Sequence, residues 1–190
     1  MLTVARSELI LGGQKSGKSR RAELLARAWL ESSDAHSAAL IATGQPWDEE
    51  MRERIRRHQV DRAERVPGLE TIEEPLLLAE TIEQHSRSER LLVVDCLTLW
   101  LTNLMMPAVG EGLSGEALES NIVKLTQSIV VAPGPLVLVG NEIGLGVIPL
   151  GREVRAFVDA LGRLNQAVAA ACSRATLMAA GLPLALKDSA

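Results

Sequence analysis

Residues 12 to 19 have the residue types and the spacing of a phosphate-binding loop (P-loop). They read Gly-Gly-Gln-Lys-Ser-Gly-Lys-Ser and match G-x-x-x-x-G-K-[ST]. A β-type run at residues 8–11 precedes them and a helical pattern at residues 18–30 follows, which is the context that the motif requires. The glycines let backbone N–H groups surround phosphate oxygens, Lys18 reaches the terminal phosphates, and the Ser19 hydroxyl can ligate Mg²⁺. The alternative is a glycine-rich turn between a strand and a helix.

Asp95 is a candidate for the second metal anchor that a P-loop enzyme needs. Four apolar residues, 91–94, lead into it. They place its carboxylate at the C-terminal end of a buried strand, where ligands collect in α/β folds. We therefore interpret Asp95 as the Walker-B residue. The alternative is a strand-end aspartate that caps the next segment.

His58 is the candidate nucleophile. It lies in a predicted helix, residues 48–61, in which Met51, Ile55 and His58 follow one another at i, i+4 and i+7. A neutral imidazole surrounded by cations can attack the α-phosphorus of a nucleotide and displace pyrophosphate, which leaves a nucleotidyl-histidine. The alternative is a half-buried structural histidine on an arginine-rich, solvated helix.

Arginines surround His58 in the sequence and favour a phosphate ligand. Two glutamates are spaced to pair with two of these arginines at i, i+4, and two further arginines then have no obvious partner. The predicted pairs are Glu50 with Arg54 and Glu53 with Arg57, and the remaining arginines are Arg56 and Arg62.

The alternation of apolar runs with helical patterns predicts a three-layer α/β fold with a mainly parallel central sheet. The runs are continuously apolar, which is typical of strands buried on both faces. We expect one domain over residues 1–190, with residues 107–116 as an exposed connection within it. The predicted strands are residues 8–11, 38–42, 91–95, 136–140 and 175–179, and the predicted helices are residues 18–30, 48–61, 75–85, 117–131 and 152–172.

Composition narrows the class of protein. The chain has 190 residues, a net charge of -4 and 2% aromatic residues, so it lacks the basic surface and stacking residues of a nucleic-acid binder. Its longest apolar stretch, residues 91–106, contains Asp95 and Asn103 and is shorter than the roughly 20 residues of a membrane span. With two distant cysteines and no signal-peptide pattern, we expect a cytoplasmic protein without a membrane span.

Further motifs continue along the chain in a fixed order. They are residues 41–44 (Ile-Ala-Thr-Gly), 48–51 with 54–58, 71–75 (Thr-Ile-Glu-Glu-Pro), 94–103 (Val-Asp-Cys-Leu-Thr-Leu-Trp-Leu-Thr-Asn), 140–146, 162–166 and 181–184. In this order they resemble the bifunctional adenosylcobinamide kinase / adenosylcobinamide-phosphate guanylyltransferase family of cobalamin biosynthesis. The resemblance spans nearly the whole chain.

The resemblance implies a RecA-like P-loop NTPase fold, a homotrimer and two activities that use ATP or GTP with Mg²⁺. The enzyme would phosphorylate adenosylcobinamide and then transfer GMP from GTP to adenosylcobinamide phosphate, with His58 as the guanylylated residue. Ser19 and Asp95 would hold the metal ion. The implied nucleotide contacts are Gly12, Gly13, Gln14, Lys15, Ser16, Gly17, Lys18, Ser19, Ala42, Thr43, Gly44, Gln59, Val60, Asp61, Arg62, Glu73 and Asp95.

This chain departs from the family pattern at two positions. Lys15 stands where the family usually has arginine, which keeps the charge but loses the bidentate fork. Leu69 stands where a tryptophan is common, and the stretch 61–70 is a few residues longer than usual.

Other interpretations stay open. Asn141 with Glu142, and Asn165 with Gln166, either contact substrate or cap and pack neighbouring segments. The chain as a whole could instead be a P-loop small-molecule kinase without guanylyltransferase activity, with a structural His58. A third reading is a GTP-binding regulatory switch in which residues 107–116 order around the nucleotide.

Overall fold

A computed structural model describes residues 2–46 and 49–189. Within the helix that contains His58 the backbone is described, but the side chains of Glu50, Met51, Arg54, Ile55 and His58 lie outside the described part. The strands are β1 (Ser7–Gly12), β2 (Ser37–Ala42), β3 (Leu69–Glu73), β4 (Arg90–Asp95), β5 (Leu136–Val139), β6 (Arg174–Ala179) and β7 (Leu182–Asp188). The helices are α1 (Lys18–Glu31), α2 (Glu49–Arg65), α3 (Leu78–His85), α4 (Leu97–Met105), α5 (Gly115–Val131) and α6 (Arg152–Ala171).

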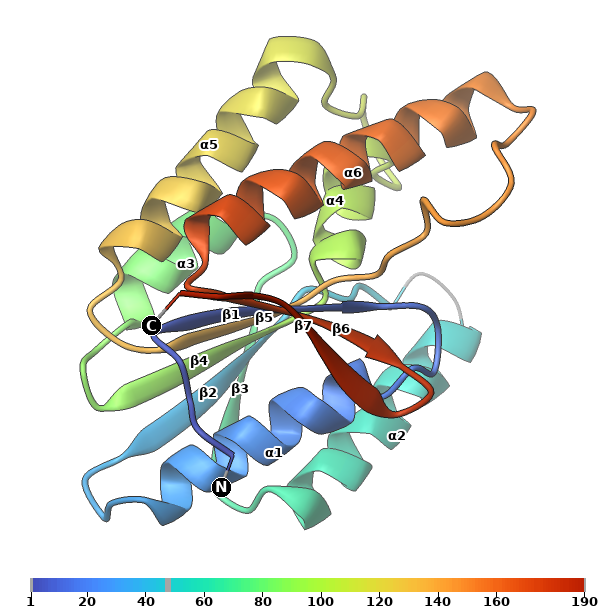
Figure 1. The fold of residues 1–190 in the computed structure, drawn as a ribbon. Helices are drawn as coiled ribbons and strands as arrows, with labels where there is room; N and C mark the ends of the chain where they lie inside the picture. The colour runs from blue at the N-terminus through green and yellow to red at the C-terminus, as the bar shows by residue number, and fades with distance from the viewer. Residues whose placement is uncertain (1, 47–48, 190) are drawn as a thin grey trace.

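The strands form one sheet in the order β3-β2-β4-β5-β1-β6-β7. All neighbours are parallel except β6 and β7, which are antiparallel. Helices α1 and α2 cover one face, and α3 to α6 cover the other (Figure 1). The predicted three-layer α/β class with a mainly parallel sheet is therefore confirmed.

Alternating side chains of the central strands pack on opposite faces. On β4, Leu92 and Val94 join the cluster under α3 to α6, whereas Leu91 and Val93 join the cluster under α1 and α2. Both sets are fully or almost fully buried. This two-sided burial explains the continuous apolar runs in the sequence.

The sequence prediction missed the two edge strands, β3 and β7. Both are largely exposed, so neither carries a continuous apolar run. Pro183 lies within β7, which an edge strand tolerates because one side of it needs no hydrogen-bond donors. The prediction relied on strands buried on both faces, and the two edge strands are not buried in this way.

Helix α4 was also missed, because its sequence was interpreted only as part of the apolar stretch 91–106. Leu97, Trp100, Leu101 and Leu104 are all buried in the core cluster. A helix buried on most sides shows no clear amphipathic period, so the pattern could not separate it from the strand before it. None of the described helices is both long and apolar enough to cross a membrane. Of the predicted connection, residues 107–116, residues 107–114 form the connection and are mostly exposed, whereas α5 already begins at Gly115.

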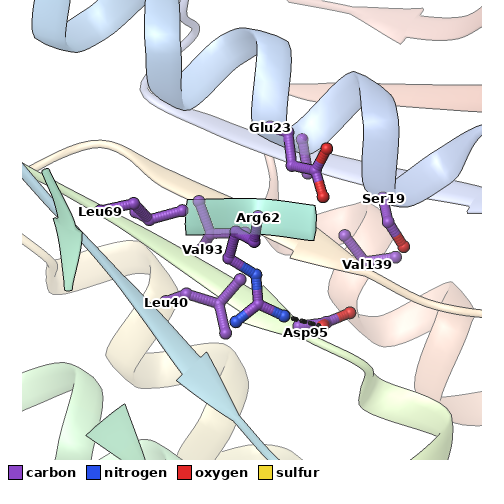
Figure 2. A pocket seen from close by; sticks show the side chains of 9 residues that line it. Ser19, Glu23, Leu40, Arg62, Leu69, Val93, Asp95 and Val139 are labelled. Atoms are coloured by element: carbon purple, nitrogen blue, oxygen red, sulfur yellow. Dashed lines mark hydrogen bonds and ion pairs between the residues drawn. The ribbon is translucent and has the colours of Figure 1, made fainter. Parts of the chain in front are cut away.

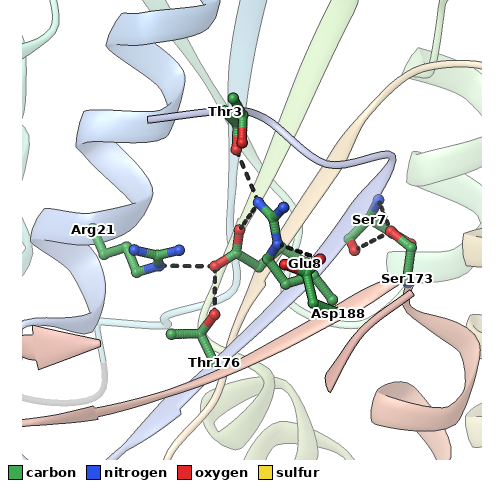
Figure 3. Close-up of polar contacts among 8 residues, drawn as sticks. Thr3, Ser7, Glu8, Arg21, Ser173, Thr176 and Asp188 are labelled. Carbon is green, nitrogen blue, oxygen red and sulfur yellow. Dashed lines mark hydrogen bonds and ion pairs between the residues drawn. The ribbon is translucent and has the colours of Figure 1, made fainter. Parts of the chain in front are cut away.

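A buried carboxylate joins four elements at the end of the sheet away from the P-loop (Figure 3). Glu8 of β1 is fully buried and accepts hydrogen bonds from Arg21 Nε of α1 at 2.8 Å and from Thr176 Oγ1 of β6 at 2.9 Å. Arg174 Nη1 lies 3.6 Å from its other oxygen and Arg174 also pairs with Asp188 of β7. This network fixes the P-loop strand and helix against β6 and β7.

Candidate active site

The register of the sheet brings three of the predicted site residues into one row. Ala42 of β2 pairs with Glu73 of β3 on one side and with Asp95 of β4 on the other. Neighbouring strands lie about 4.8 Å apart, so the two acidic residues stand about 10 Å from each other. Asp95 follows Leu91 and Val93 at a spacing of two, which turns it to the face covered by α1 and α2.

The P-loop connects β1 to α1, as predicted, and two of its glycines, Gly12 and Gly17, are required by space or backbone geometry. Gly12 has φ 155°, and a Cβ at this position would lie 2.5 Å from both the Met178 carbonyl oxygen and Ser16 Oγ. Gly17 has φ 104°, in the region that favours glycine. Two backbone hydrogen bonds brace the loop from outside, Gly181 N to Ser16 O at 3.0 Å and Glu142 N to Gly12 O at 3.1 Å.

Lys18 is held against the loop that it belongs to. Its Nζ donates a hydrogen bond to the Gly13 carbonyl oxygen at 2.6 Å, and the residue is 8% exposed. Burial lowers the pKa of Lys18, while the nearby Cys96 and Asp95 act in the opposite direction. The Lys18 ammonium is thus partly desolvated within the phosphate-binding loop.

Ser19, Asp95 and Arg62 line one pocket between α1, α2 and the sheet (Figure 2). Arg62 Nη2 lies 3.2 Å from Asp95 Oδ2, and Arg62 is 7% exposed. The prediction that Arg62 has no obvious partner is therefore wrong. Side chains alternate between the two faces of β4, and Asp95 lies on the face that α2 covers. Leu69 lines the apolar side of the same pocket.

Helix α2 also makes an ion pair to helix α1. Arg65 Nη1 lies 3.2 Å from Glu23 Oε2, and Arg65 also pairs with Asp61 within the helix. Arg56 pairs with Glu53 at i, i+3, so the prediction that Arg56 is unpartnered is wrong, as is the assignment of Glu53 to Arg57. Glu53 pairs at i, i+3 instead of i, i+4, because residues three apart are also neighbours on a helix surface.

The backbone of His58 lies in α2 one helical turn before Arg62. Its imidazole lies outside the described residues, as do the side chains of Met51 and Ile55, so the predicted apolar stripe stays a prediction. The predicted Glu50–Arg54 pair lies outside them too. The other proposed nucleotide contacts near His58 differ in exposure: Gln59 and Val60 are exposed, Asp61 is half-buried, and Glu73 on β3 is exposed.

Thr43 faces into the protein. Its side chain is fully buried, and its Oγ1 donates toward the carbonyl oxygens of Asp95 at 3.0 Å and Cys96 at 2.8 Å. Its neighbours Ala42 and Gly44 are half-buried and stand closer to the solvent edge. Thr43 was predicted as one of these three nucleotide contacts, but its side chain bonds to the backbone at the end of β4.

Helix α4 carries side chains that support the loops around the site, which the search for chemistry in the sequence missed. Asn103 Nδ2 donates to the carbonyl oxygens of Thr43 at 2.7 Å and Pro75 at 3.0 Å. Trp100 Nε1 donates to Leu76 O at 2.9 Å, and Thr98 Oγ1 accepts from Asn141 N at 2.9 Å. The polar residues of the 94–103 motif thus hold the loops that follow β2, β3 and β5. The presence of polar side chains within an apolar stretch was the available signal.

The loop after β5 supports the capping interpretation of its polar residues. Glu142 Oε1 accepts a hydrogen bond from Gly144 N at 2.7 Å, and Asn165 Nδ2 donates to Asn141 O at 3.1 Å. Asn165 is buried, whereas Gln166 is exposed on α6. These contacts close the loop on itself and onto α6.

The donor set at the pocket fits a magnesium ion bound with a nucleotide. Among the described residues, no group of three or more His, Cys, Asp or Glu side chains is placed to hold a metal ion. Mg²⁺ commonly uses only one or two protein oxygen ligands together with phosphate oxygens and water. The Ser19 hydroxyl and the Asp95 carboxylate line one pocket at the P-loop and offer two oxygen atoms of the kind that this requirement asks for.

Comparison with known proteins agrees with this geometry. Residues 8–186 match the family described as cobinamide kinase / cobinamide phosphate guanyltransferase. The bifunctional adenosylcobalamin biosynthesis protein CobP of Pseudomonas aeruginosa is 46% identical over 180 residues, covering 95% of this chain and 96% of that protein. The protein CobU of Escherichia coli, which has the same description, is 35% identical over 187 residues, covering 94% and 98%.

A solved structure, the flagellar accessory protein FlaH from Methanocaldococcus jannaschii, has a similar fold. The TM-score is 0.54 at 12% identity, and the match covers 98% of this chain and 80% of FlaH. This likeness concerns the fold alone and agrees with the RecA-like arrangement expected from the sequence. The family match over residues 8–186, together with relatives of similar length, shows that the chain belongs to the cobinamide kinase / cobinamide phosphate guanyltransferase family.

Proposed function

We propose that this chain carries out two successive reactions on a corrinoid. It phosphorylates the aminopropanol hydroxyl of adenosylcobinamide with ATP or GTP, and it then transfers GMP from GTP to the new phosphate. The products are adenosylcobinamide-GDP and pyrophosphate. The observation that carries the proposal is the pocket shared by Ser19 of the P-loop, Asp95 of β4 and Arg62 of the helix that contains His58.

The kinase step requires positioning more than covalent chemistry. The P-loop backbone from Gly12 to Ser19 and the Lys18 ammonium bind the phosphates of the nucleotide, and Ala42, Gly44 and Glu73 lie along the same edge of the sheet. Ser19 and Asp95 would hold Mg²⁺, which neutralises charge on the phosphate oxygens when it is bound. The corrinoid hydroxyl oxygen bonds to the γ-phosphorus, the bond to the bridging oxygen breaks, the nucleoside diphosphate leaves with the electron pair, and the hydroxyl proton passes to solvent.

The guanylyl step requires a nucleophile, for which we propose His58. One imidazole nitrogen attacks the α-phosphorus of GTP, the bond to the bridging oxygen of the β-phosphate breaks, and pyrophosphate leaves with the electron pair. The phosphate of the corrinoid then attacks the same phosphorus, and the phosphorus–nitrogen bond breaks. Gln59 to Arg62 are proposed guanine-nucleotide contacts on the same helix, with Arg62 at its pocket-facing side.

Labelled GTP tests the guanylyl step. Wild type, His58→Ala and the control His85→Ala are incubated with Mg²⁺ and GTP labelled at the α- or the γ-phosphate, and then separated under denaturing conditions. His85 is the control because it lies in the last turn of α3, away from the P-loop. We expect acid-labile protein label from the α position in wild type and His85→Ala only. An unlabelled wild type that still phosphorylates the corrinoid supports the kinase-only alternative, and nucleotide binding without any turnover supports the regulatory switch.

We further propose that residues 1–190 act as one catalytic domain in the cytoplasm and assemble as a homotrimer. Both cysteines are free thiols, as a reducing compartment maintains. Strand β7 exposes Leu182, Leu184 and Leu186 at 70%, 57% and 55%, and apolar groups of this kind mark subunit contacts. Sedimentation of wild type at a trimer mass, with Leu184→Glu shifted toward the 20.4 kDa monomer, is the expected result. A monomeric wild type with full turnover contradicts the trimer.

A further inference from the structure

We infer that Thr43 is a positioning residue that fixes the direction of the Asp95 carboxylate. The inference rests on the proposed metal role of Asp95 and adds a residue that acts through it. Thr43 does not face the pocket with its side chain, and its fully buried hydroxyl has another task. That task is to hold the backbone on both sides of the Asp95–Cys96 peptide bond.

The contacts of Thr43 converge on this one backbone segment. Its Oγ1 lies 3.0 Å from the Asp95 carbonyl oxygen and 2.8 Å from the Cys96 carbonyl oxygen, so its single proton is shared between them. Its backbone N–H also donates to the Asp95 carbonyl oxygen at 3.4 Å. Two groups of Thr43, the residue that follows β2, therefore hold the exit of β4.

The backbone at this exit is strained and needs such support. Cys96 has φ 145° and ψ 109°, outside the regions that L-residues ordinarily adopt. The chain ends β4 at Asp95 and begins α4 at Leu97, so this one residue makes the whole change of direction. A conformation of this kind persists only when the surroundings fix it, and at active sites it aims a side chain. Here the side chain is that of Asp95.

Asn103 fixes Thr43 in turn. Its Nδ2 donates to the Thr43 carbonyl oxygen at 2.7 Å, and the residue is 2% exposed. Its Oδ1 has no hydrogen-bond partner among the described residues, so the side chain is used for its two donor protons. Asn103 of α4 therefore holds Thr43, and Thr43 holds the backbone of Asp95, whose carboxylate lines the same pocket as Ser19.

Loss of the hydroxyl should affect metal-dependent binding in particular. Without it, the Cys96 peptide can relax, and the carboxylate then leaves the direction of Ser19. The hydrogen bonds of the Thr43 side chain go to the Asp95 and Cys96 carbonyl oxygens and not to the P-loop, so nucleotide binding without Mg²⁺ should change less than binding with Mg²⁺. A general structural defect would weaken both kinds of binding.

The test is the affinity of the purified full chain for a fluorescent GDP analogue, measured with and without Mg²⁺. Thr43→Val should lose about fivefold to tenfold of the Mg²⁺-dependent gain in affinity, as expected for one buried hydrogen-bonding group. Thr43→Ser should restore it. Thr81→Val is the matched control, because Thr81 is also buried and donates to a backbone carbonyl, that of Leu77, on α3. If Thr43→Val does not fold, Thr43→Ala compared with Thr43→Ser isolates the same hydroxyl.

Asp95→Asn separates this inference from the proposed metal role. If Thr43 acts through Asp95, the double variant should bind no more weakly with Mg²⁺ than Asp95→Asn alone. If Asp95→Asn reduces the Mg²⁺-dependent gain but Thr43→Val and Thr43→Ala do not, the positioning role of Thr43 is overturned and the metal role stands. If Asp95→Asn leaves the gain unchanged, the metal role itself is overturned, and the inference with it.

Discussion

Arg62 Nη2 lies 3.2 Å from Asp95 Oδ2, and this contact joins the helix that contains His58 to the strand that carries the proposed metal ligand. The arginine side chain is 9% exposed and the aspartate side chain 29%. A guanidinium on this carboxylate neutralises the charge that a divalent cation would use. Arg62 and Mg²⁺ are therefore expected to compete for Asp95.

Arg62→Gln should lower the Mg²⁺ concentration that half-saturates metal-dependent nucleotide binding. A partly exposed ion pair contributes up to about 1 kcal/mol, which corresponds to about a fivefold change. Titration of Mg²⁺ at a fixed concentration of fluorescent GDP measures the midpoint. Arg65→Gln is the control, because Arg65 pairs with Glu23 and Asp61 on the same side of α2. A higher midpoint in Arg62→Gln would contradict this competition and would mean that the arginine orients Asp95 for the ion or contacts the nucleotide.

The sequence was sufficient for the elements whose local pattern matches their burial. The P-loop was predicted from its motif between a strand and a helix. β4 with Asp95 and the other central strands were predicted because two-sided burial leaves continuous apolar runs. The edge strands β3 and β7 have no such burial, and their pairing depends on neighbours that are distant in sequence. Helix α4 follows β4 after a single residue, and no change in hydropathy marks that boundary.

The partners of the site residues could not be predicted for a different reason. Helical spacing suggests pairs within α2, but Arg62 instead reaches Asp95, 33 positions away in the sequence. That contact requires the crossing of α2 over the sheet, which no local pattern specifies. The same holds for Asn103, which reaches the Thr43 carbonyl across 60 positions.

Glu8→Gln should destabilise the fold strongly. The variant keeps the shape of the side chain but removes the charge that Arg21 and Arg174 face in the buried network. Breaking a buried ion pair from one side costs about 3 kcal/mol, whereas an exposed pair contributes at most about 1 kcal/mol. Urea unfolding should show this difference between Glu8→Gln and the control Glu31→Gln, whose partner Arg27 is exposed. Equal losses in the two variants would mean that the network contributes no more than a surface pair.

The two cysteines should be unreactive in the folded protein. Burial raises the pKa of Cys172 to about 12, and it also raises the pKa of the Cys96 thiol. At pH 8 about one Cys172 in ten thousand is then a thiolate, the form that reacts. Iodoacetamide at this pH should modify neither peptide in native protein and both in urea, as read by mass spectrometry. Rapid native labelling of Cys172 would mean that the end of α6 opens readily.

Lys18→Met should stabilise the fold at neutral pH while it weakens nucleotide binding. Burial lowers the pKa of Lys18 below its ordinary value of 10.5, so the folded state carries the cost of a desolvated ammonium at pH 7. Removing a functional group of this kind commonly adds about 1 kcal/mol to the free energy of unfolding.

The stability that Lys18→Met gains over wild type should decrease as pH rises. As pH rises through the lowered pKa toward 10.5, folded wild type releases the Lys18 proton before unfolded wild type does. The unfolded state then binds more protons, so wild type gains stability and the advantage of Lys18→Met shrinks. Urea unfolding at pH 7 and at pH 10 measures the difference, with Lys124→Met on the exposed side of α5 as the control. A Lys18→Met variant less stable than wild type at pH 7 would show that the hydrogen bond from Nζ to Gly13 O outweighs the cost of burial.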